Sequence, residues 1–318
     1  MKTFVLVDAS NLFHRCKFVT KGDIDIKTGM AIHIMLNSLK KICNKFEVDH
    51  VVMCLDNKSW RRNIYKNYKK HRRDKQKLQS KKDKEEQEIF QESFNEFITF
   101  CKEKTNVTVL GEDALEADDI ISGWVNHHSN DFHIILSGDT DFIQLLSNNV
   151  IIYDGVKEQT IKIDGYYDKD DEPIVDKKTK SFKKPKDPEY ELFRGDATDG
   201  IFSACPRVRE KKIKDAFDDR HRQGYAWNNL MLNEWIDAQN IKHIVKDDYI
   251  LNKTLIDLKA QPNDIKEKIN NLIKNNCYKK NIKQVGIWFL SFCEEWDLQM
   301  LKKHPEKVAK ILQLDYPY

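Results

Sequence analysis

The sequence predicts an α/β protein in which a parallel, doubly wound sheet is followed by a mostly helical region. Three observations predict this class. Short apolar runs rich in β-branched residues recur in the first half of the chain, helical patterns separate them, and only helical patterns follow residue 188. A charged stretch at 164–188, which contains three prolines, reads as a linker. We therefore expect two domains, at 1–187 and 188–318.

The predicted strands share the composition of strands that are buried on both faces of a sheet. Each run has four or five residues, and the runs are separated by segments long enough to cross over as helices. The runs are residues 4–7, 51–55, 107–110, 133–136 and 150–153.

The helices are predicted from apolar residues that fall on one face. Phe90, Phe94, Phe97 and Cys101 are spaced by four, three and four positions, which places one stripe against the sheet. In the C-terminal region we expect aromatic side chains in similar stripes to form helix core and not stacking platforms for bases. These stripes are residues 227–236, 265–273 and 287–292.

The composition limits the function classes. A chain of 318 residues with 40% hydrophobic content can bury a large core, and it has no apolar stretch near the roughly 20 residues of a membrane span. Since a strand-like run begins at once, we expect no signal peptide and a cytoplasmic location. The seven cysteines have no CxxC spacing, so we expect buried thiols. Neither a P-loop nor GxGxxG is present, so nucleoside triphosphate and dinucleotide chemistry are not supported.

Basic charge is concentrated in one segment. Residues 57–84 hold thirteen Lys or Arg and two Asp, a net +11, which leaves −8 on the rest of a chain whose net charge is +3. Within this segment, residues 60–73 mix cations with aromatics at helical spacing. Lys and Arg neutralise phosphates, and Tyr or Trp stacks on unpaired bases. The alternative is a charged helix in solvent. Repulsion between so many like charges disfavours such a helix unless a polyanion binds.

Acidic residues gather where strands end or helices begin. Three of these positions directly follow predicted strands, and ligands of open α/β sheets bind at the carboxyl ends of strands. Each acid taken alone is equally well explained as a helix cap or a turn residue. The inference therefore depends on their convergence. The acids are Asp8, Asp56, Glu116, Asp118, Asp119, Asp139, Asp141, Asp196 and Asp199.

A carboxylate cluster of this size predicts bound cations, because uncompensated carboxylates raise one another's pKa. Carboxylate oxygens suit hard ions, so we expect two Mg²⁺ (or Mn²⁺). Two such ions about 3.5–4 Å apart activate water and stabilise the leaving oxygen in phosphodiester hydrolysis. No HExxH or other zinc spacing is present.

With these motifs the sequence resembles the superfamily of flap endonucleases and 5′→3′ exonucleases, and within it the ribonuclease H of T-even-like phages. The resemblance covers most of the chain. A later stretch, 252–262, is similar to the C-terminal helical region of the phage members. The motifs that carry the resemblance are Asp8-Ala-Ser-Asn11 with Arg15, Leu55-Asp56-Asn57, Trp60-Arg61-Arg62, Tyr68-Lys69-Lys70-His71-Arg72, Leu115-Glu116-Ala117-Asp118-Asp119, Ser137-Gly138-Asp139-Thr140-Asp141 and Arg194-Gly195-Asp196-Ala197-Thr198-Asp199.

The resemblance implies a PIN-like nuclease domain, a helical arch at about 58–90, and a helix-three-turn-helix element that holds duplex DNA. It implies that Lys69 and Arg72 contact the scissile phosphate and that Tyr68 stacks on a base. The ligands that it implies for the first ion are Asp56, Glu116, Asp118 and Asp139, with Asp8 and Asp119 supporting them partly through water. Those for the second ion are Asp141, Asp196 and Asp199. The other implied contacts to nucleic acid are Arg61, Arg62 and Lys70.

Two departures from the family's pattern affect the expected partners. Many relatives follow the last acid with a glycine-rich turn that binds duplex backbone, often with a monovalent cation, but this chain lacks those glycines. We expect its basic side chains to hold phosphates instead. The N-terminus has no extension for a sliding clamp, and the tail 312–318 is either a clamp peptide or a plain chain end. The basic side chains in the turn are Arg207, Arg209, Lys211 and Lys212.

The first hypothesis is a monomeric, metal-dependent 5′ nuclease of DNA replication, which removes RNA primers (RNase H activity) and 5′ DNA flaps. Its expected partners are DNA with a 5′ flap, RNA–DNA duplex, a single-strand-binding protein and a sliding clamp. One alternative is a PIN-type ribonuclease on single-stranded RNA. The other is a non-catalytic nucleic-acid-binding protein whose acids are caps.

Overall fold

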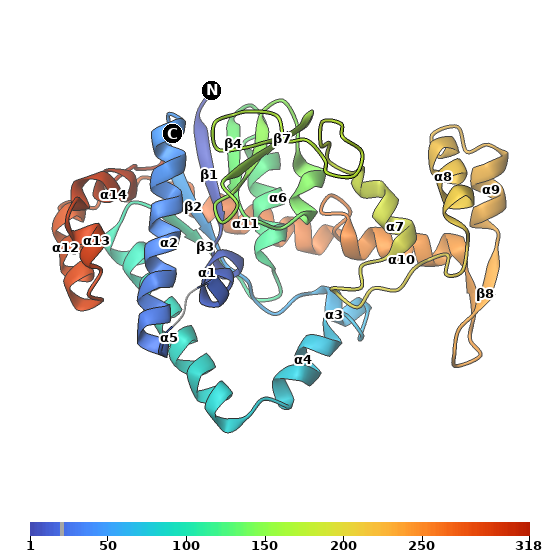
Figure 1. The fold of residues 1–318 in the computed structure, drawn as a ribbon, viewed down its shortest axis with the longest axis horizontal. Coiled ribbons are helices and arrows are strands. Elements are labelled where there is room, and N and C mark those ends of the chain that lie inside the picture. Colours follow the sequence, from blue (N-terminus) through green and yellow to red (C-terminus); the bar gives the residue numbers. More distant parts are fainter. Residues whose placement is uncertain (20–21) are drawn as a thin grey trace. The chain divides into compact units, whose positions relative to one another are not determined.

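The structure is a computed structural model that describes residues 1–19 and 22–318 (Figure 1). The chain forms two compact units and passes between them more than once. Unit 1 contains residues 1–59, 79–185 and 265–318, and unit 2 contains residues 60–78 and 186–264. Among the described residues, no helix is long and apolar enough to cross a membrane.

Unit 1 is built on a seven-stranded sheet of order β3-β2-β1-β4-β5-β6-β7. The five predicted strands are confirmed and run parallel. Two further strands were not predicted. They form an antiparallel edge of the sheet. They were missed because these short strands have polar flanking residues and leave only a weak pattern in the sequence. The strands are β1 (Thr3–Asp8), β2 (His50–Cys54), β3 (Thr108–Leu110), β4 (Phe132–Leu136), β5 (Val150–Asp154), β6 (Gln159–Lys162) and β7 (Gly165–Tyr167).

Helices cover both faces of this sheet. On one face Val5 and Val7 join a core with α1 (Ala9–Val19), α2 (Ile24–Lys45) and α5 (Lys81–Lys104). The predicted stripe of α5 is confirmed, since Phe90, Phe94, Phe97 and Cys101 are all buried. On the other face Phe4 packs edge-to-face against Trp124 of α6 (Ala117–His127), with ring centroids 5.4 Å apart.

The last four helices return to unit 1, which a single division at 187/188 did not anticipate. Phe292 of α12 stacks on Phe100 of α5 at 4.3 Å between centroids, so these C-terminal helices complete the core of the first domain. A local pattern gives no sign of such a long-range return. The helices are α11 (Asn263–Asn276), α12 (Val285–Glu295), α13 (Gln299–Lys302) and α14 (Pro305–Leu312).

The chain end is docked on unit 1. The Tyr318 hydroxyl donates to both oxygens of Asp131 at 2.8 Å, and Asp315 accepts hydrogen bonds from the backbone N–H groups of Lys280 and Asn281 at 2.9 Å. The tail is therefore not a plain, unattached chain end. A sliding clamp has to displace these contacts before it can take the tail as a peptide.

Unit 2 has a smaller core around Phe193, Ile213 and Leu230. The stripe predicted at 227–236 is only partly helical, because Trp235 lies in a hairpin strand and Ile236 is exposed. The elements of unit 2 are α3 (Arg61–Ile64), α4 (Lys70–Lys77), η2 (Pro188–Tyr190), α7 (Glu191–Arg194), α8 (Glu210–Asp219), α9 (Tyr225–Met231), β8 (Glu234–Ile236), β9 (Lys242–Ile244) and α10 (Val245–Ile256).

Candidate active site

Three of the predicted acids lie together at the carboxyl ends of neighbouring strands. Asp8 ends β1, Asp56 follows β2, and Asp139 follows β4. Strands β2 and β4 flank β1, and the strand order reverses between β1 and β4. Ligands of open α/β sheets bind where the order reverses, at the carboxyl ends of the strands. The topology thus brings together acids that are 131 positions apart in the sequence.

Hydrogen bonds join the ends of β1 and β4. The Ser137 hydroxyl donates to Asp8 Oδ2 at 2.9 Å, and the same oxygen of Ser137 accepts from the backbone N–H of Asp139 at 3.0 Å. Asn11, one helical turn after Asp8, has its Nδ2 3.5 Å from Asp139 Oδ2. These contacts fix the direction of the carboxylates before any ligand binds.

The electrostatics of Asp8 fit a cation site. Asp8 is 2% exposed, and its pKa is raised well above the ordinary value, first by burial and then by the charges of Asp56 and Asp139. A hydrogen bond from Ser137 opposes this rise only in part. A divalent cation among these carboxylates removes the cause of the raised pKa, because it stabilises their ionised forms. The residues present therefore fit a hard cation.

The N-terminus of α6 adds more carboxylates to the same region. The backbone N–H of Ala117 donates to Asp56 Oδ1 at 2.9 Å, which ties the start of α6 to the end of β2. The charges of Asp8, Asp56 and Asp118 all raise the pKa of the buried Cys54 thiol, after the larger effect of burial. Three acids from three segments thus surround one side chain.

Glu116 and Asp119 form a capping box at the start of α6. Asp119 Oδ2 accepts from the Glu116 backbone N–H at 3.2 Å, and Asp119 is fully buried. Ser59 donates to Glu116 Oε2 at 2.6 Å, and the Glu116 side chain also accepts from the Asp119 backbone N–H in the capping box. Both acids therefore serve as cap residues of α6, which holds their carboxylates at the start of the helix.

Asp139 and Asp141 lie on one tight turn, as predicted. The backbone N–H of Asp141 donates to Asp139 Oδ1 at 3.1 Å, and Asp141 begins the short 3-10 helix η1 (Asp141–Leu145). One oxygen of Asp139 is thus used by its own turn, while Oδ2 faces Asn11. Both side chains are half-buried, so they are open to solvent on one side.

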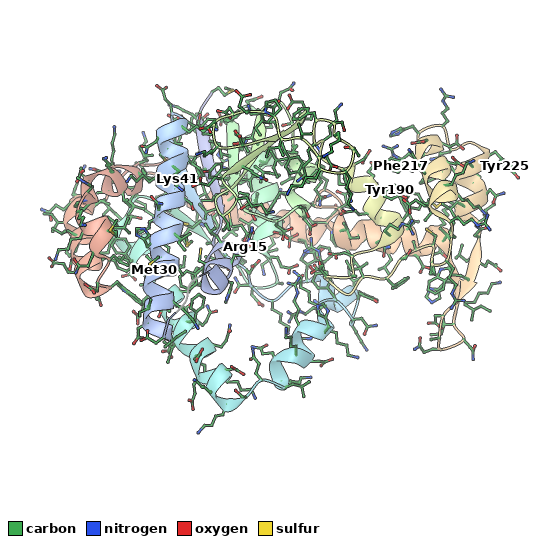
Figure 2. The ribbon with its side chains drawn as sticks, viewed as in Figure 1. Arg15, Met30, Lys41, Tyr190, Phe217 and Tyr225 are labelled. Atoms are coloured by element: carbon green, nitrogen blue, oxygen red, sulfur yellow. The ribbon has the colours of Figure 1, made fainter. Side chains whose placement is uncertain are left out.

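Four supporting side chains were not predicted as site residues. The Ser10 hydroxyl accepts from the Asp56 backbone N–H at 3.1 Å, and Ser59 and Ser137 hold Glu116 and Asp8. Arg15 of α1 (Figure 2) lies over Gly138, where a Cβ would be 1.2 Å from its Nη1. The available signal was adjacency, because each serine lies within three positions of a predicted acid in the sequence.

The remaining two acids belong to unit 2. Asp199 is 9% exposed, and its carboxylate lies 2.7 Å from Arg72 Nη2 and 3.4 Å from Lys69 Nζ. Asp196 accepts from both the backbone N–H and the hydroxyl of Thr198 at 2.7 Å. Within unit 2, Asp199 therefore lies beside the two cations that were expected to contact phosphate.

The basic segment is not one continuous helix. It forms α3 and α4, which are separated by Tyr65–Lys69, and Lys69 has a left-handed φ of 51°. Tyr68 is 3% exposed and packs with Ile201 and Leu255, so it does not present its face to a base in this structure. Arg61 is also buried, and its Nε donates to the Leu255 carbonyl at 2.8 Å. Both side chains are part of the core of unit 2.

The other basic candidates are more accessible. Arg62 is half-buried and Lys70 is exposed. The turn after Asp199 leaves its cations on the surface, and Arg207 itself has a left-handed φ of 64°. Arg207 thus adopts a positive-φ conformation without being a glycine. The exposed cations of the turn are Arg207, Arg209, Lys211 and Lys212.

The profile of one protein family, "5′-3′ exonuclease, N-terminal resolvase-like domain", matches residues 3–171, which is more than half of the chain. The chain belongs to this family. It is therefore a metal-dependent nuclease that hydrolyses phosphodiesters at 5′ ends. The predicted superfamily, fold class and enzyme class are confirmed, and the non-catalytic alternative is wrong.

This nuclease has similar curated relatives. The flap endonuclease Xni of Pseudoalteromonas translucida (strain TAC 125) is 26% identical over 266 residues, which cover 81% of this chain and 94% of the relative. The flap endonuclease Xni of Shewanella woodyi (strain ATCC 51908 / MS32) is 28% identical over 168 residues, which cover 52% of this chain and 61% of the relative.

Solved structures share its fold. The T5 D15 protein co-crystallised with metal ions has a TM-score of 0.61 and 17% identity, with 87% of this chain and all of that chain covered. A pseudo-enzyme–product complex of the bacteriophage T5 D15 flap endonuclease with DNA and metal ions has a TM-score of 0.60 and 18% identity, with 86% and 98% covered.

Proposed function

We propose that this 5′ nuclease is a flap endonuclease and 5′→3′ exonuclease that removes 5′ DNA flaps and RNA primers during DNA replication. The observation that carries the proposal is the convergence of Asp8, Asp56 and Asp139 at the reversal of strand order. Support for the substrate comes from the relatives, which are flap endonucleases, and from a structural neighbour that is bound to DNA and metal ions. The basic charge of residues 57–84 supports a polyanionic substrate.

The first ion of the proposed site is held by acids of unit 1. Its proposed direct ligands come from the ends of β2 and β4 and from the start of α6, and Asp8 and Asp119 support them from buried positions. When bound, a pair of Mg²⁺ ions supplies an activated water and stabilises the leaving oxygen. The direct ligands are Asp56, Glu116, Asp118 and Asp139.

The second ion is proposed to bind Asp141, Asp196 and Asp199. The two last acids lie in unit 2, so their part in this site rests on the family's motif. Within unit 2, Lys69 and Arg72 are the counter-ions of Asp199. Both cations could neutralise a phosphate in place of the Asp199 carboxylate. We propose that both contact the scissile phosphate.

The protein's own groups orient the substrate. Terminal nucleotides have to unpair before they reach the carboxylates, which costs a few kcal/mol and costs least at a flap or nick. The exposure of the cations at 207–212 supports a contact to duplex backbone through their side chains. We propose that the protein works as a monomer with contacts to a single-strand-binding protein, in the cytoplasm of its cell or, if phage-encoded, of the host.

The proposal is tested with three 5′-labelled substrates in one assay: a DNA flap, an RNA-primed duplex and single-stranded RNA. We expect Mg²⁺-dependent cleavage of the first two, which EDTA abolishes. Asp139→Asn and Asp141→Asn are expected to reduce flap cleavage at least about a hundredfold while they still shift the flap on a gel, since even outer-shell changes cost about 10–100-fold. Preferred cleavage of single-stranded RNA would favour the PIN-type ribonuclease.

The second ion site has its own variant. Asp196→Asn is expected to slow cleavage with less effect on binding. Asp187→Asn is a matched control, because this exposed acid of the same unit pairs with Arg220 and has no proposed role at the ion site. Equal rates for the two variants would remove Asp196 from the ligand set and leave the acids of unit 1 in place.

A further inference from the structure

We propose that His127, His128 and Cys277 form a structural binding site for a zinc ion, separate from the carboxylate site. Each side chain offers one ligand atom, and the three atoms lie within 4.8 Å of one another. Zinc binds His nitrogen at about 2.0–2.1 Å and Cys sulfur at about 2.3 Å, so modest side-chain rotations bring all three to one ion. The mixture of imidazole and thiolate selects zinc over Mg²⁺.

The backbone holds the three ligands in one region of unit 1. His127 ends α6, His128 follows it, and Cys277 follows α11. The two helices pack closely, because a Cβ added at Gly123 of α6 would lie 2.2 Å from Ile269 Cγ2 of α11. Both helices are labelled in Figure 1. Their close packing limits how far the ligand-bearing ends can separate.

His128 is prepared to be a ligand. Its Nδ1 lies 3.3 Å from the Trp124 carbonyl oxygen, and since a carbonyl only accepts, Nδ1 carries the proton. The lone pair is then on Nε2, as in metal sites where a carbonyl fixes the tautomer of the ligating imidazole.

Tyr316 links the ligands to the docked chain end. Its hydroxyl lies 3.0 Å from His128 Nε2 and is also hydrogen-bonded to the Cys277 thiol. Three protein ligands leave a fourth tetrahedral position for an oxygen, and this hydroxyl or a water is at hand to fill it. An ion here joins α6, α11 and the tail of the chain. The competing interpretation is a hydrogen-bonded cluster that fastens the tail without an ion.

Ion binding is coupled to loss of a proton. Burial raises the pKa of the Cys277 thiol, and only the thiolate binds zinc. The ion therefore forms a bond to sulfur as the thiol proton passes to solvent. The affinity falls as the pH is lowered, because protons compete for the same sulfur.

The test uses Co²⁺ as a spectroscopic probe on the full chain. Thiolate ligation gives a sulfur-to-cobalt charge-transfer band in the near ultraviolet, which carboxylate ligands cannot give, so the carboxylate site does not interfere. We expect one equivalent of Co²⁺ to produce the band and Zn²⁺ to displace it. Cys277→Ser is expected to abolish the band, and His127→Ala is expected to weaken binding about tenfold or more.

The matched control is Cys43→Ser, which removes another half-buried thiol of unit 1 and should leave the band unchanged. Asp139→Asn should also leave the band unchanged, which separates this proposal from the proposed function. Melting curves check that each variant is folded. Absence of the band in the wild type, or its persistence in Cys277→Ser, would overturn the proposal and leave the hydrogen-bonded cluster.

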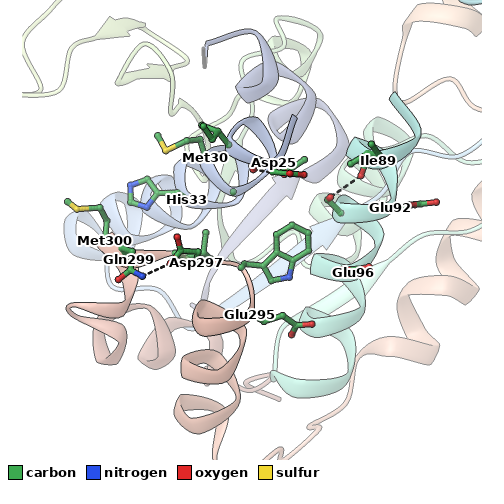
Figure 3. Close-up of a pocket in the computed structure, with 16 residues that line it drawn as sticks. Asp25, Met30, His33, Ile89, Glu92, Glu96, Glu295, Asp297, Gln299 and Met300 are labelled. Carbon is green, nitrogen blue, oxygen red and sulfur yellow. Dashed lines mark hydrogen bonds between the residues drawn. The ribbon is translucent and has the colours of Figure 1, made fainter. Parts of the chain in front are cut away.

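A second, independent observation is an acid-rimmed groove in unit 1 (Figure 3), formed by α2, α5 and the segment from the end of α12 to α13. Its cavity volume is 710 Å³. We infer that this groove docks a basic amphipathic helix of a partner protein. The inference is carried by the chemistry of the lining.

The groove is lined by apolar side chains and by negatively charged side chains. Ile26, Met30 and Met300 are 53%, 41% and 65% exposed, so the groove presents apolar surface to solvent. The sixteen described lining residues include five carboxylates and no lysine or arginine. Methionine-rich grooves suit helical partners because the flexible thioether adapts to their side chains. The carboxylates are Asp25, Glu92, Glu96, Glu295 and Asp297.

The charge excludes nucleic acid as the occupant. Five carboxylates repel a phosphate backbone, whereas lysine or arginine on the polar face of a helix complements them. An apolar stripe on the other face of that helix buries the exposed isoleucine and methionines. Charge complementarity and exposed apolar area thus point to the same kind of partner.

The probe is a fluorescent synthetic helix with one leucine face and one lysine face, and binding is followed by anisotropy. We expect saturable binding that Glu92→Lys weakens about tenfold, a change of 1.4 kcal/mol. Glu103→Lys is the control, because it makes the same charge change at an exposed position of α5 outside the groove. A scrambled peptide of equal charge without an apolar face should bind more weakly.

Three outcomes would overturn this inference. One is equal binding of the ordered and scrambled peptides, which would show charge attraction alone. Another is an equal loss of peptide affinity in Glu92→Lys and Glu103→Lys. The third is a sedimentation or light-scattering result in which the groove variant alone changes the protein from dimer to monomer, which would make a second copy of this chain the occupant.

Discussion

Lys69 is bound to Asp199 through both its backbone and its side chain. The Lys69 backbone N–H donates to the Asp199 carbonyl at 2.7 Å, and Lys69 Nζ lies 3.4 Å from Asp199 Oδ2. Both side chains are largely buried, at 17% and 12% exposure, so solvent screens this pair less than a surface pair. Lys69 of the basic segment and Asp199 of the second acidic turn are therefore held together inside unit 2.

Lys69→Ala is expected to reduce the rate of flap cleavage strongly, with a milder loss of binding. The reason is that a phosphate contact made in the transition state contributes to kcat, while a general electrostatic anchor contributes to affinity. Lys246→Ala is the control, since Lys246 is an exposed lysine of the same unit for which no contact to nucleic acid is proposed. Single-turnover rates and gel shifts separate the two effects, and a change in affinity alone would make Lys69 a phosphate anchor.

Ser59→Ala is expected to raise the Mg²⁺ concentration required for half-maximal activity by about 10–100-fold, the usual cost of losing a group that orients a metal ligand. Ser59 donates to Glu116 Oε2 at 2.6 Å, so its loss frees that carboxylate to rotate. Ser147→Ala removes a hydroxyl that bonds Asn149 instead and serves as the control. Superimposable Mg²⁺ titrations would show that Ser59 does not position Glu116.

Gly123→Ala is expected to destabilise the protein by about 1–3 kcal/mol, the usual cost of overpacking a core. The added Cβ would lie 2.2 Å from Ile269 Cγ2 where α6 and α11 pack. Gly286→Ala is the control, because its Cβ would meet the nearest side chain at an ordinary 3.7 Å. Urea denaturation of the double variant with Ile269→Ala should show less than the sum of the two single effects, and strict additivity would mean that the two positions do not clash.

Asp8 is expected to give the ion-free protein a pH dependence of stability. Its folded pKa is raised above the ordinary value of 3.8, so folding favours the protonated carboxyl. The stabilising contribution is complete below pH 3.8 and is lost as the pH rises through the higher folded pKa. In EDTA, the free energy of unfolding of the wild type should therefore fall relative to that of Asp8→Asn as the pH rises through this window.

Mg²⁺ provides the second half of that prediction. Added Mg²⁺ should reduce the pH dependence, because the cation stabilises the ionised form of the carboxylates that raise the pKa of Asp8. A difference between wild type and Asp8→Asn that stays flat from pH 3.8 to neutrality in EDTA would contradict the raised pKa.

Local sequence patterns predicted much of the fold because they report short-range structure. The β-branched runs correctly marked all five parallel strands, and the spacing of Phe90, Phe94 and Phe97 correctly marked the buried face of α5. The same method failed at Trp235, where an apolar run continued from a helix into a hairpin strand. Periodicity over so few residues does not separate the two conformations.

The candidate site was predictable as a set of residue types but not as a geometry. Strand-end position alone identified Asp8, Asp56 and Asp139. Their convergence follows from β1 lying between β2 and β4, and strand order is a non-local property. Adjacency to Asp139 could have marked Ser137 as a site residue, but its bond to Asp8 could not be predicted, since it spans 129 positions.

The sequence by itself determined the class of chemistry, because carboxylates at strand ends and a dense basic segment are sufficient to specify hard cations and a polyanion. Only the tertiary structure decided which of the predicted basic and aromatic side chains remain accessible to nucleic acid. Tyr68 and Arg61 have the composition of a nucleic-acid contact but are buried, because packing against Leu255 removes apolar surface from water and gives the Arg61 guanidinium a carbonyl partner. Burial of this kind depends on residues nearly 200 positions away in the chain.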